Sequence, residues 1–140
     1  MLCEAAAFYK AQGKSLYDVL QDIYAEFGYY KDFLKSVTIP GADGAEKIKS
    51  ILAALRANPK SEVCGIAVKD VQDFTTAEMI VKGFPRSNVL KYILSDGSWI
   101  AIRPSGTEPK CKFYYSVVAE NASAVEEKLA AIRKEFEPEV

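Results

Sequence analysis

The chain has 140 residues, of which 49% are hydrophobic and 26% are charged, and its formal net charge is −1. This is typical of one globular domain, or of one domain with an appendage, and it gives no basic surface that would attract nucleic acid or a membrane. The chain has no histidine, which excludes histidine triads and histidine metal sites. Cys3, Cys64 and Cys111 are too few and too scattered for a disulfide framework or a zinc site, so we expect reduced thiols in a cytoplasmic protein.

Two helices are predicted at the N-terminus. Residues 2–12 are rich in helix-forming residues, and Gly13 can end them in a left-handed conformation. Ser15 is then a plausible N-cap with Asp18 three residues later, and Gly28 ends the second helix. The apolar stripe of this second helix is formed by Leu16, Val19, Leu20, Ile23, Tyr24 and Phe27.

The middle of the chain predicts a strand, a helix and a second strand. Residues 35–41 form a short strand that closes at a Pro-Gly pair, and a helix begins at Asp43 or Gly44. The apolar face of that helix consists of Ile48, Ile51, Leu52 and Leu55. Residues 62–74 predict one strand that is buried on at least one face, and residues 75–88 predict an irregular connection.

The last third of the chain predicts a hairpin, a further strand and a closing helix. Two strand-like runs flank Ser95 to Ser98, where Asp96 and Gly97 are a favoured type I′ turn pair. In the next strand Cys111, Phe113, Tyr115 and Val117 share one face, and Lys110, Lys112, Tyr114 and Ser116 share the other. Ser123 and Glu126 predict the capping box of a helix whose apolar stripe is Val125, Leu129, Ile132 and Phe136. Consecutive strands of this kind favour an antiparallel sheet with helices packed on one face.

The segment RPSGTEPK, between the last two strands, combines groups that can bind an anion. Arg103 offers a planar fork of donors, and Ser105 and Thr107 offer hydroxyl groups. Gly106 lets successive backbone N–H groups turn toward one point, and a proline at each end restricts the loop. The same composition also suits a plain tight turn in which Arg103 is solvated and Glu108 pairs with it or with Lys110.

As a whole string, RPSGTEPK followed by CKFYY resembles the phosphate-binding loop of the α-D-phosphohexomutases, the phosphoglucomutase and phosphomannomutase enzymes. The final helix AVEEKLAAIRKEF resembles the helix that closes the family's chain, and residues 5–30 resemble the helices that end its third domain. The resemblance implies an α+β fold: a TATA-binding-protein-like domain with an antiparallel sheet of four to five strands and two helices on one face. It assigns residues 1–32 to a helical remnant of the preceding domain and a linker, and residues 33–140 to the C-terminal domain.

The resemblance also implies which residues bind the substrate. The set that would hold the substrate phosphate that is not being transferred is Arg103, Ser105, Gly106, Thr107 and Lys110. The implied substrate is a phosphosugar such as glucose 1-phosphate or glucose 6-phosphate, and the residues do not distinguish glucose from mannose, glucosamine or pentose phosphates.

The family's other reactive parts are absent from this sequence. It contains no Ser-His-Asn-Pro phosphoserine motif, no Asp-Gly-Asp loop for magnesium and no Gly-Glu-Glu sugar-binding loop. We therefore expect a C-terminal piece with an artificial start at Met1, no catalytic residue and no metal of its own, and no activity alone. Mg²⁺ and the remaining domains would belong to the full-length enzyme. We expect the helix face of Leu16, Leu20, Ile23 and Phe27 to be partly exposed, since its partner domain is missing.

Two other functions stay open at this point. A sheet domain of this kind could dock a partner protein or RNA, with Phe113 and Tyr114 stacking on bases, although core packing is the commoner fate of such residues. A small-phosphate sensor that is complete in itself is the other alternative.

Overall fold

The computed structural model describes residues 1–41 and 43–138. The helices are α1 (Leu2–Ala11), α2 (Leu16–Phe27), α3 (Gly44–Ala57), α4 (Ala77–Val81) and α5 (Ala122–Phe136). The strands are β1 (Tyr29–Thr38), β2 (Glu62–Val63), β3 (Ile66–Asp73), β4 (Leu90–Leu94), β5 (Trp99–Pro104) and β6 (Lys110–Ala119).

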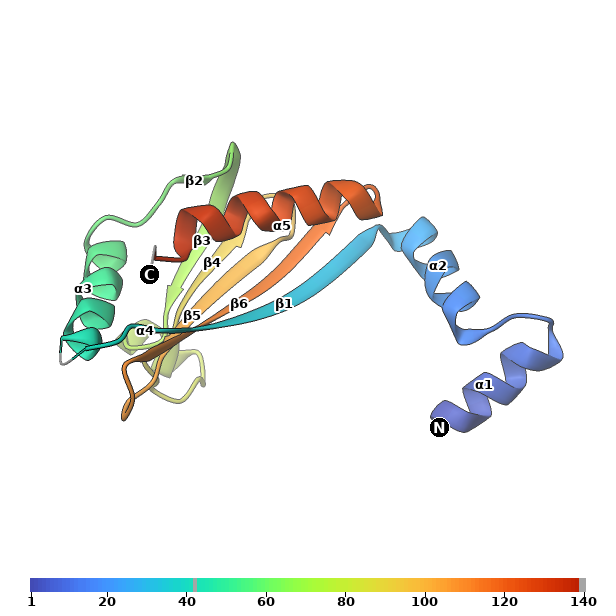
Figure 1. Ribbon diagram of the computed structural model, residues 1–140, viewed down its shortest axis with the longest axis horizontal. Helices are drawn as coiled ribbons and strands as arrows, with labels where there is room; N and C mark the ends of the chain where they lie inside the picture. The colour runs from blue at the N-terminus through green and yellow to red at the C-terminus, as the bar shows by residue number, and fades with distance from the viewer. Residues whose placement is uncertain (42, 139–140) are drawn as a thin grey trace.

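The six strands form one sheet in the order β1-β6-β5-β4-β3-β2, and every neighbouring pair is antiparallel. Figure 1 shows α5 lying across the strands with α3 at one end of the sheet, while α1 and α2 extend away from the first residues of β1. The expected α+β class and antiparallel sheet are confirmed. The sheet has six strands, rather than four or five, because residues 62–73 form two strands.

The hydrophobic core lies between one face of the sheet and the helices α3 and α5. The strands alternate as expected, so that Ile100 and Ile102 of β5 are fully buried while Arg103 is exposed. The strand residues of the core include Tyr92, Leu94, Cys111, Phe113, Tyr115 and Val117, and the helix residues are Ile48, Leu52, Val125, Leu129, Ile132 and Phe136. Each such side chain contributes about 1.5–3 kcal/mol through burial, so this layer holds α3 and α5 on the sheet.

The two N-terminal helices follow the local signals in the sequence. Ser15 and Asp18 form the predicted capping box, with reciprocal bonds between each side chain and the other's backbone N–H. Gly13 and Gly28 both adopt positive φ where the helices end. No residue of α2 is buried, and its apolar side chains Leu16, Leu20, Ile23 and Phe27 are 36%, 40%, 46% and 64% exposed. The expected exposure of this face is confirmed.

Strand β1 is longer than the sequence predicts. It begins at Tyr29 rather than at Lys35, and it pairs with β6 along its whole length, from Tyr29 opposite Ala119 to Thr38 opposite Lys110. Residues 29–36 run in apolar and polar pairs rather than in strict alternation, so the sequence predicts a linker up to residue 32 and no strand before Lys35. The non-local partner β6 extends the strand.

One strand prediction and one turn prediction for the sheet need correction. Residues 62–74 do not form one strand: Cys64 (φ 50°) and Gly65 (φ 78°) form a tight two-residue turn between β2 and β3. The type I′ turn expected at Asp96–Gly97 is wrong, because only Gly97 has positive φ there. The Asp96 carboxylate instead accepts from Ser98 N–H and pairs with Lys128 of α5, contacts that fix another turn.

The cap of α5 also differs from the prediction. Asn121, not Ser123, is the N-cap, and its side-chain oxygen accepts from Ala124 N–H at 2.9 Å. Ser123 lies inside the helix and donates to Glu127. The predicted irregular connection over residues 75–88 contains the short helix α4.

Candidate phosphate-binding site

Arg103 lies at the end of β5, on the face of the sheet turned away from the core. Its cross-strand partner in β6 is Lys112, so the two cationic side chains share one face of neighbouring strands. Both residues are exposed. The pairing of β5 with β6 thus places two positive charges side by side at the mouth of the loop that connects these strands.

The connecting loop is closed by its own hydrogen bonds. Ser105 N–H donates to Lys110 O at 2.7 Å, and Lys110 N–H donates to Glu108 O at 2.7 Å. The Ser105 hydroxyl oxygen accepts from Glu108 N–H at 3.2 Å and from Thr107 N–H at 3.4 Å. Because the oxygen lone pairs of Ser105 face these amides, its hydroxyl hydrogen is the group left to donate to a ligand.

The loop and the strand ends enclose a recess of about 260 Å³. Its lining consists of Arg103, Pro104, Ser105, Gly106, Glu108, Lys110 and Lys112. Four of the five predicted site residues therefore lie around one cavity. Three cations and one carboxylate line it, so this recess is locally positive in a chain whose net charge is −1.

Lys112 is the lining residue that the sequence analysis missed. It lies beyond the RPSGTEPK string, and only its register opposite Arg103 brings it to the recess. The alternation of β6 placed Lys112 on the polar face, and knowledge of the strand pairing would have identified it.

Thr107 is the one predicted site residue that does not line this recess, although Ser105 and Gly106 also line the recess in which it lies. It lines an adjoining recess of about 270 Å³, which is bounded by Ala45, Ile48 and Lys49 of α3 and by Asn88. Gly106 lines both recesses but does not have positive φ. Gly106 therefore does not form the type of backbone nest that combines a right-handed with a left-handed helical residue.

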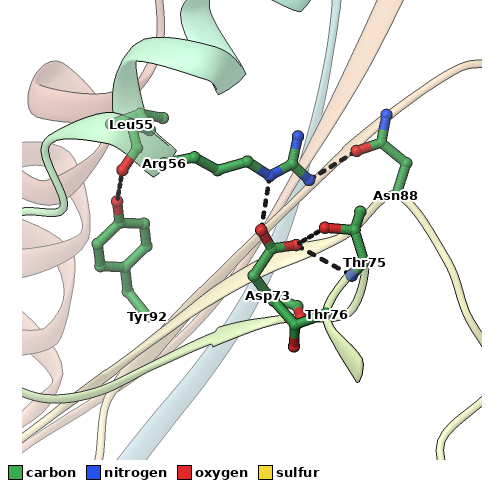
Figure 2. Close-up of polar contacts among 7 residues, drawn as sticks. All are labelled: Leu55, Arg56, Asp73, Thr75, Thr76, Asn88 and Tyr92. Atoms are coloured by element: carbon green, nitrogen blue, oxygen red, sulfur yellow. Dashed lines mark hydrogen bonds and ion pairs between the residues drawn. The ribbon is translucent and has the colours of Figure 1, made fainter. Parts of the chain in front are cut away.

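A polar network joins the end of α3 to Asp73 at the end of β3 and to Thr75 and Asn88, which lie between β3 and β4 (Figure 2). Arg56 at the end of α3 donates to Asp73 Oδ2 at 2.9 Å and to Asn88 Oδ1 at 2.7 Å. Asp73 Oδ1 accepts from the backbone N–H and the hydroxyl of Thr75 at 3.0 and 2.8 Å. Asn88 is thereby fixed where it lines the recess that contains Thr107.

Asp73 is the titratable centre of this network. Its partial burial opposes ionisation and is the largest single influence, but the hydrogen bonds from Thr75 and Arg56 together outweigh burial. The pKa of the Asp73 carboxyl is therefore lowered from its ordinary value of 3.8. Asp73 stays charged under neutral conditions and holds Arg56 in place.

The structure also bears on the other functions. Phe113 is 1% exposed and packs in the core, so it cannot stack on a base, whereas Tyr114 is partly exposed on the opposite face. Within residues 1–41 and 43–138, no three carboxylate, thiol or imidazole groups come together as metal ligands would. None of the helices in this described part is both long and apolar enough to cross a bilayer.

Comparison with known proteins gives a consistent result. Residues 42–136 match the family model of the phosphoglucomutase/phosphomannomutase C-terminal domain. Phosphoglucomutases of Staphylococcus aureus strains MSSA476 and MW2 are each 37% identical to the chain, over 94% of the chain and 25% of their own length. The chain thus spans about a quarter of the length of these curated relatives.

A solved structure supports the fold. The open form of parafusin, a phosphoglucomutase from Paramecium, superimposes with a TM-score of 0.59 at 15% identity, over 90% of this chain and 24% of that one. Because the family model covers most of the chain, and the fold agrees with it, the chain belongs to the phosphoglucomutase/phosphomannomutase family and carries its C-terminal domain.

Proposed function

We propose that this chain acts as the substrate-phosphate-binding domain of a phosphohexomutase, which interconverts sugar 1-phosphates and 6-phosphates by intramolecular phosphoryl transfer. The observation that carries the proposal is the recess in which Arg103, Lys110 and Lys112 meet around the Ser105 hydroxyl and Gly106. A local cluster of cations in an otherwise neutral chain suits an anionic group rather than a long polyanion.

Each residue has a distinct part in this proposal. The Arg103 guanidinium would grip two phosphate oxygens at once, while Lys110 and Lys112 would add point charges. The Ser105 hydroxyl would donate a hydrogen bond, and Gly106 would let the phosphate approach the backbone. Thr107, which lines the adjoining recess, would reach the phosphate only after the loop has turned.

By binding the substrate phosphate that is not being transferred, this domain would contribute to catalysis without touching the reacting phosphate. Phosphoryl transfer depends mainly on position and charge stabilisation, and energy from a distant phosphate can orient the reacting end. A site that contacts the phosphate and few atoms of the sugar would accept the substrate with either its 1-phosphate or its 6-phosphate in the recess. The domain would also close over the cleft as a lid.

The remaining parts of the reaction would come from other domains, since the curated relatives are about four times as long as this chain. We propose that the phosphoserine, the sugar-binding loop and Mg²⁺ belong to those domains and that this chain alone is inactive.

The test is an NMR titration of this chain with glucose 1-phosphate, glucose 6-phosphate and inorganic phosphate. A site with a few charge-assisted contacts should bind with a Kd on the order of 1 mM. Shifts should be confined to the recess and should disappear in Arg103→Ala, whereas Arg86→Ala removes an equal charge at another exposed position and should keep them. Equal binding by both variants would contradict the proposal, as would no binding by the wild type.

A further inference from the structure

We propose that Glu108 tunes the phosphate recess: its carboxylate competes with the phosphate for Lys110 and weakens the preference for a doubly charged phosphate. This inference rests on the proposed function of the recess. It gives Glu108, whose negative charge repels phosphate, a role in determining which charge state of the phosphate is preferred.

The geometry places the Glu108 carboxylate among the cations. Its side chain lines the same recess as Arg103, Lys110 and Lys112. Glu108 Oε2 lies 3.1 Å from Lys110 Nζ, and the two side chains are 60% and 34% exposed. The ammonium group that would bind the phosphate is therefore already paired with an anion of the chain itself.

The loop fixes this pairing through its backbone. Glu108 N–H is held by the Ser105 hydroxyl and Glu108 O accepts from Lys110 N–H, so the two side chains leave the loop from fixed positions. These anchors are backbone groups of Glu108 and do not require its carboxylate. In the described part of the chain, Lys110 is the hydrogen-bond partner of that carboxylate. Replacing it with an amide should therefore leave the loop folded.

The charge of the ligand determines how strongly the carboxylate opposes it. A phosphate monoester changes from a monoanion to a dianion near pH 6. The dianion is attracted more strongly by the three cations, but it is also repelled more strongly by Glu108, so the carboxylate offsets part of the gain from the second charge. Glu108 would thus keep affinity moderate, which suits a phosphate that must be released so that the sugar can turn over.

The experiment compares four proteins by NMR titration with methyl phosphate, at pH 5.5 and at pH 7.5: wild type, Glu108→Gln, Lys110→Gln and the double variant. Glu120→Gln is the matched control, because Glu120 is an exposed carboxylate at the other end of β6 and its loss changes the net charge equally. Glu108→Gln should tighten binding at pH 7.5 by about threefold. The gain should be smaller at pH 5.5, smaller in the Lys110→Gln background, and absent in the control.

The outcomes separate this inference from the function on which it rests. If the wild type binds and Arg103→Ala does not, while Glu108→Gln binds no more tightly at either pH, the role of Glu108 is excluded and the phosphate site stands. An equal gain in Glu120→Gln would also exclude it, because a general charge effect would then be sufficient. If neither wild type nor Glu108→Gln binds methyl phosphate, the proposed function fails and this inference fails with it.

Discussion

Gly44 lies directly against Pro109: a Cβ atom added at position 44 would come within 2.9 Å of Pro109 Cβ and would overlap Ile39 O. Ile39 N–H in turn donates to Pro109 O at 2.9 Å. The first turn of α3, the end of β1 and the end of the loop between β5 and β6 therefore meet at one point. This contact couples the position of the loop to the packing of α3 on the sheet.

Gly44→Ala is expected to disturb this junction. The new methyl group would overlap a backbone carbonyl, which cannot move as a flexible side chain can, so the free energy of unfolding should fall by about 1–3 kcal/mol. Urea denaturation measures the loss, and the amide shifts of residues 105–108 report whether the loop moves. A variant as stable as the wild type, with unchanged loop shifts, would show that the junction is looser than these distances indicate.

Gly106→Ala separates binding from folding. Nothing lies within 4 Å of a Cβ at this position and φ is not positive, so stability should change by less than about 0.5 kcal/mol. The methyl group would nevertheless extend from the rim of the recess, and the affinity for inorganic phosphate should fall at least about threefold. Unchanged affinity in this stable variant would argue that the phosphate does not approach the backbone at Gly106.

Asp73→Asn tests the polar network around Asp73. The lowered pKa of Asp73 means that its carboxylate stabilises the fold above the unfolded-state value near 3.8, and that this contribution is lost as the pH falls through the folded-state pKa. The variant should lose about 1–2 kcal/mol at pH 7 and less at pH 3. Denaturation curves at the two pH values check this, with Glu120→Gln as a surface control. A loss of equal size at both pH values would show that charge is not the cause.

The exposed face of α2 should drive self-association. Leu20 and Ile23 are 40% and 46% exposed on a helix with no buried residue. The double variant Leu20→Lys/Ile23→Glu keeps the net charge and should remain monomeric where the wild type associates, with little change in stability. Sedimentation over a range of concentrations measures the self-association of both proteins. Identical behaviour of the two proteins, both monomeric, would mean that this face does not mediate contacts.

The features that the sequence predicts well are those fixed by neighbouring residues. The Ser15–Asp18 capping box and the stripe from Val125 to Phe136 depend on residues three or four apart, and both form as expected. The turn at Asp96–Gly97 differs from the prediction, and one of its contacts is not local, since the Asp96 carboxylate pairs with Lys128 of α5. The Cys64–Gly65 turn escaped notice because cysteine rarely adopts positive φ.

The candidate site divides in the same way. Arg103, Ser105 and Gly106 are identified by a contiguous string, and they line one recess. Lys112 lines the recess through strand pairing, whereas Thr107 lines the adjoining recess and its N–H donates to the Ser105 hydroxyl oxygen at 3.4 Å. Residue types alone specify neither the register of two strands nor the direction in which a loop side chain points.

The long pairing of β1 with β6 has a consequence for the order of folding. These strands occupy residues 29–38 and 110–119, so the edge strand is made early in synthesis and must wait for its partner. The hairpin of β4 and β5 closes over a short loop, which costs far less chain entropy. We expect the sheet to grow from that hairpin outward, so that β1 is translated before the other strands and docks last.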